Sequence, residues 1–556
     1  MNIKINSNKL IFLSLLSLCL IQYYLFKSFV KYEIINFYPA NYDQTSYLLL
    51  VYHLFENIKT SGFHTIFLPG DILPTGILFP LQALLSFFIL GANRFSALLP
   101  NFLYFIIMQI TVFFTAKKLF GSYSYSFILL GLILTLNTPF WSGGIVDFRM
   151  DFLAFNLYGI LTCLFLLSQN FLLRQWVIYL ALTVVLLILL RFITFIFLLP
   201  IACFLVIQFT YSYRLRQNIQ DKLCAKKRLI NLLIFFSIIL IFIVPCFIIT
   251  GNELYQYYVI SHLSEKQFRS VAHHSIWQFI KFYPTVIKNQ HIGHMGKIAI
   301  KLLIAFAFLT LILRQIISFK KNYFLYRPIT MMDLFTLLLL IACPILILML
   351  DPVVSFVVCG IVGIPLLLLL VSLFFYMTYP LTIYWPLPLN IVASFILILG
   401  LIYQWQAYVI HREKDQTLKD SANITQLYEN IGNYAIQHHW SDIKLSMDFV
   451  TDYLNYGSFI TLYYEKNGKL LTILTERMGS DLFSPLSKEQ ALASLKASNV
   501  VILTVGKFPD KKQAFFPGIQ SIAYFRPQLA QYTTQHFSYF GHYVFKGYEH
   551  NVYVAR

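Results

Sequence analysis

The stretch Leu229–Thr250, LINLLIFFSIILIFIVPCFIIT, contains 22 residues and no charged side chain. An α-helix needs about 20 predominantly apolar residues to cross the hydrocarbon core of a bilayer. The three residues immediately before it, Lys226, Lys227 and Arg228, are all basic. An apolar run of this length with basic residues at one end predicts a transmembrane helix whose basic end lies in the cytoplasm.

The composition extends this conclusion to most of the chain. Hydrophobic residues make up 58% of the 556 residues and charged residues 12%, against about 45–50% and about 25% in an average soluble protein. The mean hydropathy is +0.68. Too little polar surface is available for a soluble multidomain enzyme, and too much apolar material is present for a disordered chain. The sequence therefore predicts a polytopic α-helical membrane protein.

Eleven transmembrane helices are predicted from runs of this kind. Their approximate ranges are 10–26, 95–116, 123–141, 152–169, 175–190, 193–211, 229–250, 298–313, 329–350, 352–375 and 389–409. Lysine and arginine outnumber aspartate and glutamate by 42 to 24. Because basic residues cluster at 117–118, 214–228 and 314–327, this excess is better explained by the positive-inside rule than by nucleic-acid binding. The N-terminus is then cytoplasmic, and the chain ends on the outer side.

The run Leu73–Leu90 is apolar but is interrupted by Pro74, Gly76 and Pro80. If it crossed the membrane, every later basic loop would move to the outer side. We therefore predict an interfacial or re-entrant segment within one long external loop that extends from Lys31 to about Arg94. In this loop the apolar spacing of Ser46–Lys59 predicts a helix that lies along the membrane surface.

A second external loop is predicted at 251–297, and its five histidines (His262, His273, His274, His291 and His294) are expected to be solvated. After Val409 the composition becomes polar, which divides the chain into a transmembrane domain (1–410) and a soluble external α/β domain (411–556). Helices are predicted at 415–440 and 453–464, and strands at 443–449 and 500–504. The last of the seven cysteines is Cys359, and no spacing indicates a disulfide framework or a zinc site.

Ionisable residues at the ends of membrane helices are candidate functional residues, because burying them costs several kcal/mol. On the predicted topology several of them meet on the outer side. They are Asp43, the group Asp147, Arg149 and Asp151, then Arg191, and Asp351. Because these residues lie at the outer ends of different helices, we expect them to form one shared site.

The motifs around these residues resemble those of the C-type glycosyltransferase superfamily, most closely the bacterial members akin to protein O-mannosyltransferases and lipid A aminoarabinose transferases. Asp43 lies in YPANYDQTSY (38–47), soon after the first span. A histidine- and proline-containing stretch follows from His64 to Pro80, and a second acidic loop, DFRMD, occupies 147–151. The resemblance covers roughly residues 10–210.

This resemblance implies an enzyme that moves a sugar from a polyprenyl-phosphate donor to a lipid, glycan or protein acceptor at the outer face of a bacterial inner membrane. Asp43 would be the general base of an inverting transfer, and Arg149 and Arg191 would bind the donor phosphate. Asp147 and Asp151 would support them or hold a divalent metal, Mg²⁺ or Mn²⁺. No cofactor is certain. His64, Asp71 and Asp351 are further candidates. Besides donor, acceptor and membrane lipids, no nucleic acid is expected.

Two other functions remain open at this stage. A flippase or transporter of a lipid-linked saccharide would place its charges near the bilayer midplane, within repeated halves. An O-antigen ligase or polymerase also has large external loops, but lacks the two acidic loops seen here. Individual residues have structural alternatives as well. Arg191 could reach toward lipid headgroups, Asp71 could belong to a Pro-Gly-Asp turn, and the 147–151 group could cap a helix.

Overall fold

The structure is a computed structural model that describes residues 7–39, 42–63, 78–141, 143–215, 219–255, 276–316, 330–350, 359–384, 386–410, 415–451, 453–475, 486–506, 517–545 and 547–556. The contacts between these residues divide the chain into two compact units. The first comprises 1–25, 67–83 and 98–409, and the second comprises 26–66, 84–97 and 410–556. The second unit thus combines the C-terminal residues with parts of the predicted first external loop.

The first part of the chain is almost entirely helical. Its elements are α1 (Ser7–Phe29), the π-helix η1 (Val30–Ile34), α2 (Ile35–Phe37), α3 (Tyr42–Ser61), α4 (Leu78–Leu90), α5 (Arg94–Phe120), α6 (Tyr123–Thr135), the 3₁₀ helix η3 (Thr138–Phe140), α7 (Met150–Leu167), α8 (Arg174–Leu190), α9 (Ile193–Leu215) and α10 (Ile219–Tyr255). The next are α12 (Ile276–Val286), the π-helix η5 (Ile287–Ile292), α13 (Gly293–Ile316), α14 (Met331–Leu350), the 3₁₀ helix η6 (Cys359–Val362), α16 (Gly363–Tyr384) and α17 (Pro386–Ile410).

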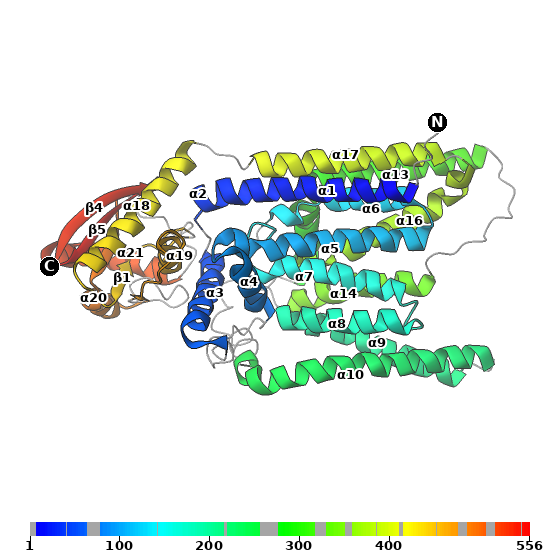
Figure 1. Ribbon diagram of the computed structural model, residues 1–556, viewed down its shortest axis with the longest axis horizontal. Coiled ribbons are helices and arrows are strands. Elements are labelled where there is room, and N and C mark those ends of the chain that lie inside the picture. The colour runs from blue at the N-terminus through cyan, green and yellow to red at the C-terminus, as the bar shows by residue number, and fades with distance from the viewer. Residues whose placement is uncertain are drawn as a thin grey trace. The chain divides into compact units, whose positions relative to one another are not determined.

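Ten of the helical segments in the described residues are long and apolar enough to cross a membrane, and α8 is a shorter apolar helix of 17 residues. Figure 1 shows α5, α7, α8 and α10 of the first unit running roughly parallel to one another. Leu233, Ile241 and Ile248 on α10 are more than half exposed. Side chains of this kind would be unfavourable in water, so this surface is explained by contact with lipid. The chain is a multi-pass membrane protein, as the sequence predicted.

Small and polar residues join helices inside the first unit. A Cβ atom at Gly400 on α17 would lie 2.8 Å from the carbonyl oxygen of Gly131 on α6, so only glycine allows these backbones to approach so closely. Gln22 on α1 and Gln109 on α5 exchange two hydrogen bonds of 3.0 and 2.9 Å. Both amides are buried, and each satisfies the hydrogen-bonding groups of the other, which lipid could not do.

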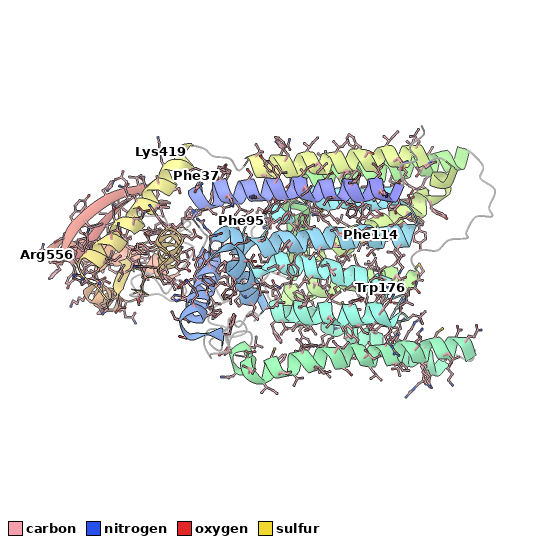
Figure 2. All side chains as sticks on the ribbon, viewed as in Figure 1. Phe37, Phe95, Phe114, Trp176, Lys419 and Arg556 are labelled. Atoms are coloured by element: carbon pink, nitrogen blue, oxygen red, sulfur yellow. The ribbon has the colours of Figure 1, made fainter. Side chains whose placement is uncertain are left out.

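Several predicted boundaries differ from the structure; the helix predicted at 352–375, for example, is observed at Gly363–Tyr384. The first helix does not end at Phe26 but continues through η1 and α2 to Phe37. Arg94 accounts for this, because its guanidinium donates hydrogen bonds to the carbonyl oxygens of Ile35 (2.9 Å) and Tyr38 at the helix end. Figure 2 labels Phe37, the last residue of α2, and Phe95, the second residue of α5. In the second loop, α12 and η5 form where a loop was expected.

The C-terminal residues form an α/β fold in the second unit. Its elements are α18 (Asp415–Gln437), β1 (Ile443–Met447), α19 (Tyr456–Asn467), β2 (Ile473–Thr475), α20 (Lys488–Ala497), β3 (Val500–Val505), α21 (Pro517–His536), β4 (Phe537–Phe545) and β5 (Tyr548–Ala555). The strand order is β2-β1-β3-β5-β4. β1 pairs in parallel with β2 and β3, whereas β5 pairs antiparallel with β3 and β4. The helices and strands predicted in this region are confirmed.

The run VVILT at 500–504 is buried because β3 lies between helices on both faces of the sheet. Val500 and Ile502 belong to a core formed with α18 and α19. Val501 and Leu503 belong to a second core formed with α20 and α21. Successive side chains of a strand point to opposite faces, so a continuous apolar strand requires a covering layer on each side.

Asp448, Thr504 and His550 are buried polar residues beside β1, β3 and β5. The Asp448 carboxylate accepts hydrogen bonds from the Thr504 backbone N–H (2.9 Å) and the Arg526 Nε (3.0 Å). Burial raises the pKa of Asp448 to about 6, although Arg526 and Thr504 oppose the shift. Burial lowers the pKa of His550 to about 4, and the charges of His542 and Arg526 add to this effect. The pKa shifts of the two buried groups are therefore opposite in direction.

We expect the variant His550→Phe to make the stability of this sheet fall as the pH rises from about 4 to 6. The pKa of Asp448 in the folded protein lies above its ordinary value of 3.8. The protonated carboxyl therefore contributes its whole stabilising effect below pH 4, and this effect is lost as the carboxyl ionises. The pKa of His550 is lower in the folded protein, so its stabilising contribution grows over the same pH range. In wild type the two contributions nearly cancel, and stability should change little between pH 4 and 6. At about 1.4 kcal/mol per pKa unit, the free energy of unfolding of the variant should fall by about 3 kcal/mol over this pH range.

The measurement is hydrogen exchange of β3 and β5 amides in the full-length protein, corrected for intrinsic exchange at each pH. The control variant Asp448→Asn should show the reverse slope, with stability falling as the pH drops from about 6.5 to 4. Parallel profiles for wild type and both variants would contradict the assignment of these two groups.

Candidate functional site

The candidate site in the first unit is built on the connection between α6 and α7. Asn137, two residues after the end of α6, fixes its beginning. The backbone N–H of Asn137 donates to the carbonyl oxygen of His291 (2.8 Å), and its side-chain amide donates to the carbonyl oxygen of Gln290. Tyr403 on α17 donates to the Asn137 side-chain oxygen at 2.6 Å. Two helical segments, η5 and α17, thus hold this connection in one position.

Asp147 lies in the same connection and is only 7% exposed. Its Oδ2 accepts the backbone N–H of Gly143 (2.9 Å) and lies 3.1 Å from Nε of Arg149. Asn101 on α5 donates to the carbonyl oxygen of Asp147 at 3.0 Å. The side chain of Arg149 therefore stands beside a carboxylate whose backbone and side chain are both fixed by hydrogen bonds.

Asp151 and Arg191 form a second ion pair, which the sequence could not specify. Asp151 occupies the first turn of α7, and Arg191 follows the last residue of α8. Oδ1 of Asp151 lies 2.9 Å from Nη1 of Arg191, and both side chains are largely buried. Thr194 bonds to the carbonyl oxygen of Arg191 through its backbone N–H and its hydroxyl, so the turn between α8 and α9 is tight. Both predicted phosphate ligands are paired with acids.

An apolar cavity of about 210 Å³ lies between α7, α8, α9, α10 and α14. Leu180, Val184 and Ile188 contribute one face of α8 to its lining, since they are spaced four residues apart. Ile188 precedes Arg191 by three residues, and Phe195, also in the lining, follows it by four. The cavity lining therefore reaches to within about one helical turn of the Asp151–Arg191 pair.

Asp43 belongs to the second unit, where it lies in the first turn of α3 and is exposed. The helix predicted at 46–59 is confirmed, and the structure extends it to 42–61. His64, Asp71 and Asp351 lie outside the described residues.

The described residues do not fit a metal centre. No three His, Cys, Asp or Glu side chains among them are grouped so that they could hold a metal ion. Asp147 and Asp151 each lie against a guanidinium, which already neutralises the charge that would attract a divalent cation.

Two buried residues were missed from the sequence. His291 was expected to be solvated, but it is only 3% exposed and packs against Thr138, with its Nδ1 3.4 Å from the Thr138 hydroxyl. It lies in the π-helix η5, a distortion that often marks functional positions. The second is Arg94, expected at the end of a loop but 1% exposed and bonded to Glu465. Neither residue has a local sequence pattern that indicates its partner.

Comparison with known proteins identifies the fold. No protein-family model and no curated protein sequence matches the chain. Among solved structures, ArnT from Cupriavidus metallidurans in the apo state matches with a TM-score of 0.51 and 10% identity, covering 99% of this chain and 98% of that one. The same protein bound to undecaprenyl phosphate matches with a TM-score of 0.52 and 10% identity, covering 97% of each chain. An oligosaccharyltransferase from Archaeoglobus fulgidus matches at 0.47 and 11% identity, covering 96% and 74%. This chain therefore has the fold of ArnT along almost its whole length, and the fold expected from its resemblance to the C-type glycosyltransferases is confirmed.

Proposed function

We infer that this protein is a membrane glycosyltransferase that uses a polyprenyl-phosphate sugar as donor. The observation that carries the proposal is that Arg191, paired with Asp151, lies about one helical turn along the chain from Ile188 and Phe195, which line an apolar cavity. A polyprenyl-phosphate sugar has the matching chemistry, since an anionic phosphate joins an apolar chain to a polar sugar. An ArnT structure that shares this fold contains undecaprenyl phosphate, which is a polyprenyl phosphate without a sugar.

In this proposal Arg149 and Arg191 bind the donor phosphate, and the cavity receives the first isoprene units. Each guanidinium has five N–H donors in a fixed plane, so it can contact a phosphate and a carboxylate along different edges. Asp147 and Asp151 hold the guanidinium groups in orientation. A buried arginine whose position is fixed binds phosphate with less loss of side-chain entropy.

The proposed reaction is a direct displacement with inversion. A hydroxyl or amine of the acceptor attacks the anomeric carbon of the sugar from the side opposite the phosphate. Its proton passes to the Asp43 carboxylate as the new bond forms. The bond between the anomeric carbon and the phosphate oxygen breaks, and its electron pair leaves on the polyprenyl phosphate. Arg149 and Arg191 stabilise the negative charge that grows on this leaving group.

The test is incubation of the purified protein with a panel of polyprenyl-phosphate sugars, followed by quantification of the donor and of free polyprenyl phosphate. We expect at least one donor to be consumed when a lipid, glycan or protein acceptor is present. In sealed vesicles, movement of intact donor across the bilayer without consumption would instead support the transporter alternative. Polymerisation of a glycan that is already linked to the lipid would support the O-antigen alternative.

We expect alkaline phosphatase fused after Arg556 to be active in a bacterial host, and a fluorescent protein that matures only in the cytoplasm to be dark there. The reason is the cluster of basic residues in the short loops at 117–118, 214–228 and 314–327, which should stay cytoplasmic. The same two reporters fused after Lys222 should give the opposite results. A fluorescent C-terminal fusion would reverse the proposed orientation and move Asp43 to the wrong side for an external reaction.

A further inference from the structure

We propose that helix α19 of the C-terminal region positions Asp43, and that Arg94 and Glu465 are the positioning residues that connect them. The proposal rests on the function proposed above, in which Asp43 is the base. It also assigns a role to the C-terminal residues in that reaction. All the residues involved belong to the second compact unit.

One face of α3 is docked on α19. Thr45, two residues after Asp43, donates a hydrogen bond to the side-chain oxygen of Asn455 (3.4 Å), the residue that caps α19. Two and three turns further on, Tyr52 donates to Glu465 (2.8 Å) and Glu56 accepts from the Tyr464 hydroxyl (2.6 Å). Spacings of seven and four residues place Thr45, Tyr52 and Glu56 on the same side of a helix.

Asp43 lies on the other side of α3. At about 100° per residue, its side chain is about 200° around the helix from that of Thr45. The burial agrees, because Thr45 is 1% exposed whereas Asp43 is exposed to solvent. The contact with α19 therefore fixes the helix while it leaves the carboxylate accessible to an acceptor.

The packing between the two helix starts is close. A Cβ atom added at Gly457 in α19 would lie 2.8 Å from Oγ1 and 2.9 Å from Cβ of Thr45. Real Cβ atoms essentially never approach so closely, so any larger residue at 457 would displace Thr45. Since Thr45 and Asp43 share the first turns of α3, such a displacement would move the carboxylate as well.

Arg94 binds the chain segment that precedes Asp43 in the sequence. Its Nε lies 2.9 Å from both carboxylate oxygens of Glu465, while its other nitrogens donate to the carbonyl oxygens of Ile35 and Tyr38. Burial and the Glu465 carboxylate raise the pKa of Tyr52, so its hydroxyl remains a donor to the same acid. The segment that carries Asp43 is thus fastened before it by Arg94 and after it by Thr45, and both attachments lead to α19.

The decisive variants are Glu465→Gln and Gly457→Ala, with Lys466→Gln as the matched control. Lys466 follows Glu465 on α19, but its side chain is 56% exposed and pairs with Glu429 on the surface. We expect both test variants to reduce the single-turnover rate by about 10- to 100-fold, because small displacements of a reacting group have effects of that size. Donor affinity should stay within about twofold of wild type, since Arg149 and Arg191 are unchanged. The control should match wild type in both quantities.

A second comparison separates positioning from simple stabilisation. The double variant Arg94→Met, Glu465→Met removes both charges, so no unpaired charge remains buried, and its thermal stability should exceed that of Glu465→Gln. Its turnover should stay low, because no guanidinium holds Ile35 and Tyr38. If the double variant recovers stability and turnover together, the pair has only a structural role and the proposal is wrong.

Hydrogen exchange tests the attachment without any donor. Glu465→Gln should increase exchange in peptides from residues 36–39 and 42–50 relative to wild type and Lys466→Gln. Unchanged exchange there would overturn the attachment, whatever reaction the protein catalyses. Increased exchange with wild-type turnover would overturn the role in positioning. If wild type consumes no polyprenyl-phosphate sugar at all, the proposed function fails and the role assigned to Asp43 fails with it.

Discussion

Replacing Asp43 by asparagine is expected to reduce the single-turnover rate by about 10²- to 10⁴-fold, the usual contribution of a general base. The amide has nearly the shape of the carboxylate but cannot accept the proton of the attacking hydroxyl or amine. Contacts in the ground state should persist, so donor affinity should be close to that of wild type. Asp43 is exposed at the start of α3, and the substitution should therefore disturb folding little.

The measurement combines donor affinity with single-turnover kinetics in detergent or nanodiscs, after thermal unfolding has confirmed that the variant is folded. Asp221→Asn is the matched control, because Asp221 also lies in the first turn of an exposed helix start, that of α10. It should retain wild-type kinetics. A wild-type rate for Asp43→Asn would show that Asp43 is not the base, and Asp147 or Asp151 would become the next candidate.

Replacing Arg191 by alanine is expected to weaken donor binding by about 10- to 150-fold. A hydrogen bond to a charged group contributes about 1.5–3 kcal/mol, and the phosphate would lose such a bond. Turnover should also slow, because negative charge on the phosphate grows as the sugar departs. Both effects appear together in kcat/KM, so the loss for the full reaction should exceed the loss in affinity alone.

The Asp151–Arg191 pair makes a second variant necessary. Removal of Arg191 leaves the largely buried Asp151 carboxylate without this partner, which by itself destabilises the protein. The double variant Asp151→Asn, Arg191→Ala removes that penalty and should regain stability, but it should still bind donor weakly. Arg191→Lys should bind donor better than Arg191→Ala, since it keeps the charge. Donor binding at the wild-type level in the double variant would reduce Arg191 to a structural partner of Asp151.

Local sequence patterns account for much of the fold. An apolar run such as Leu229–Thr250 forms a membrane helix wherever it occurs, because every backbone polar group in lipid must be satisfied within the segment. Within the proline-interrupted stretch 73–90, the described residues Leu78–Leu90 form a helix of 13 residues, which is shorter than a membrane span usually requires. The buried strand at 500–504 followed from its continuous apolar residues. These features depend on residues that are close together in the sequence, so they can be predicted from it.

The sequence by itself thus determined a multi-pass membrane protein with an α/β region at its C-terminus. It also indicated four candidate functional residues: Asp147, Arg149, Asp151 and Arg191. Only the tertiary structure decided which of them pair. Arg191 meets Asp151, 40 residues earlier, and Arg94 meets Glu465, 371 residues later. Periodicity records which face of a helix is apolar, but a single buried charge leaves no periodic trace of its partner. Such pairs form only where distant helices pack together, because a buried charge is tolerated only beside a group that neutralises it.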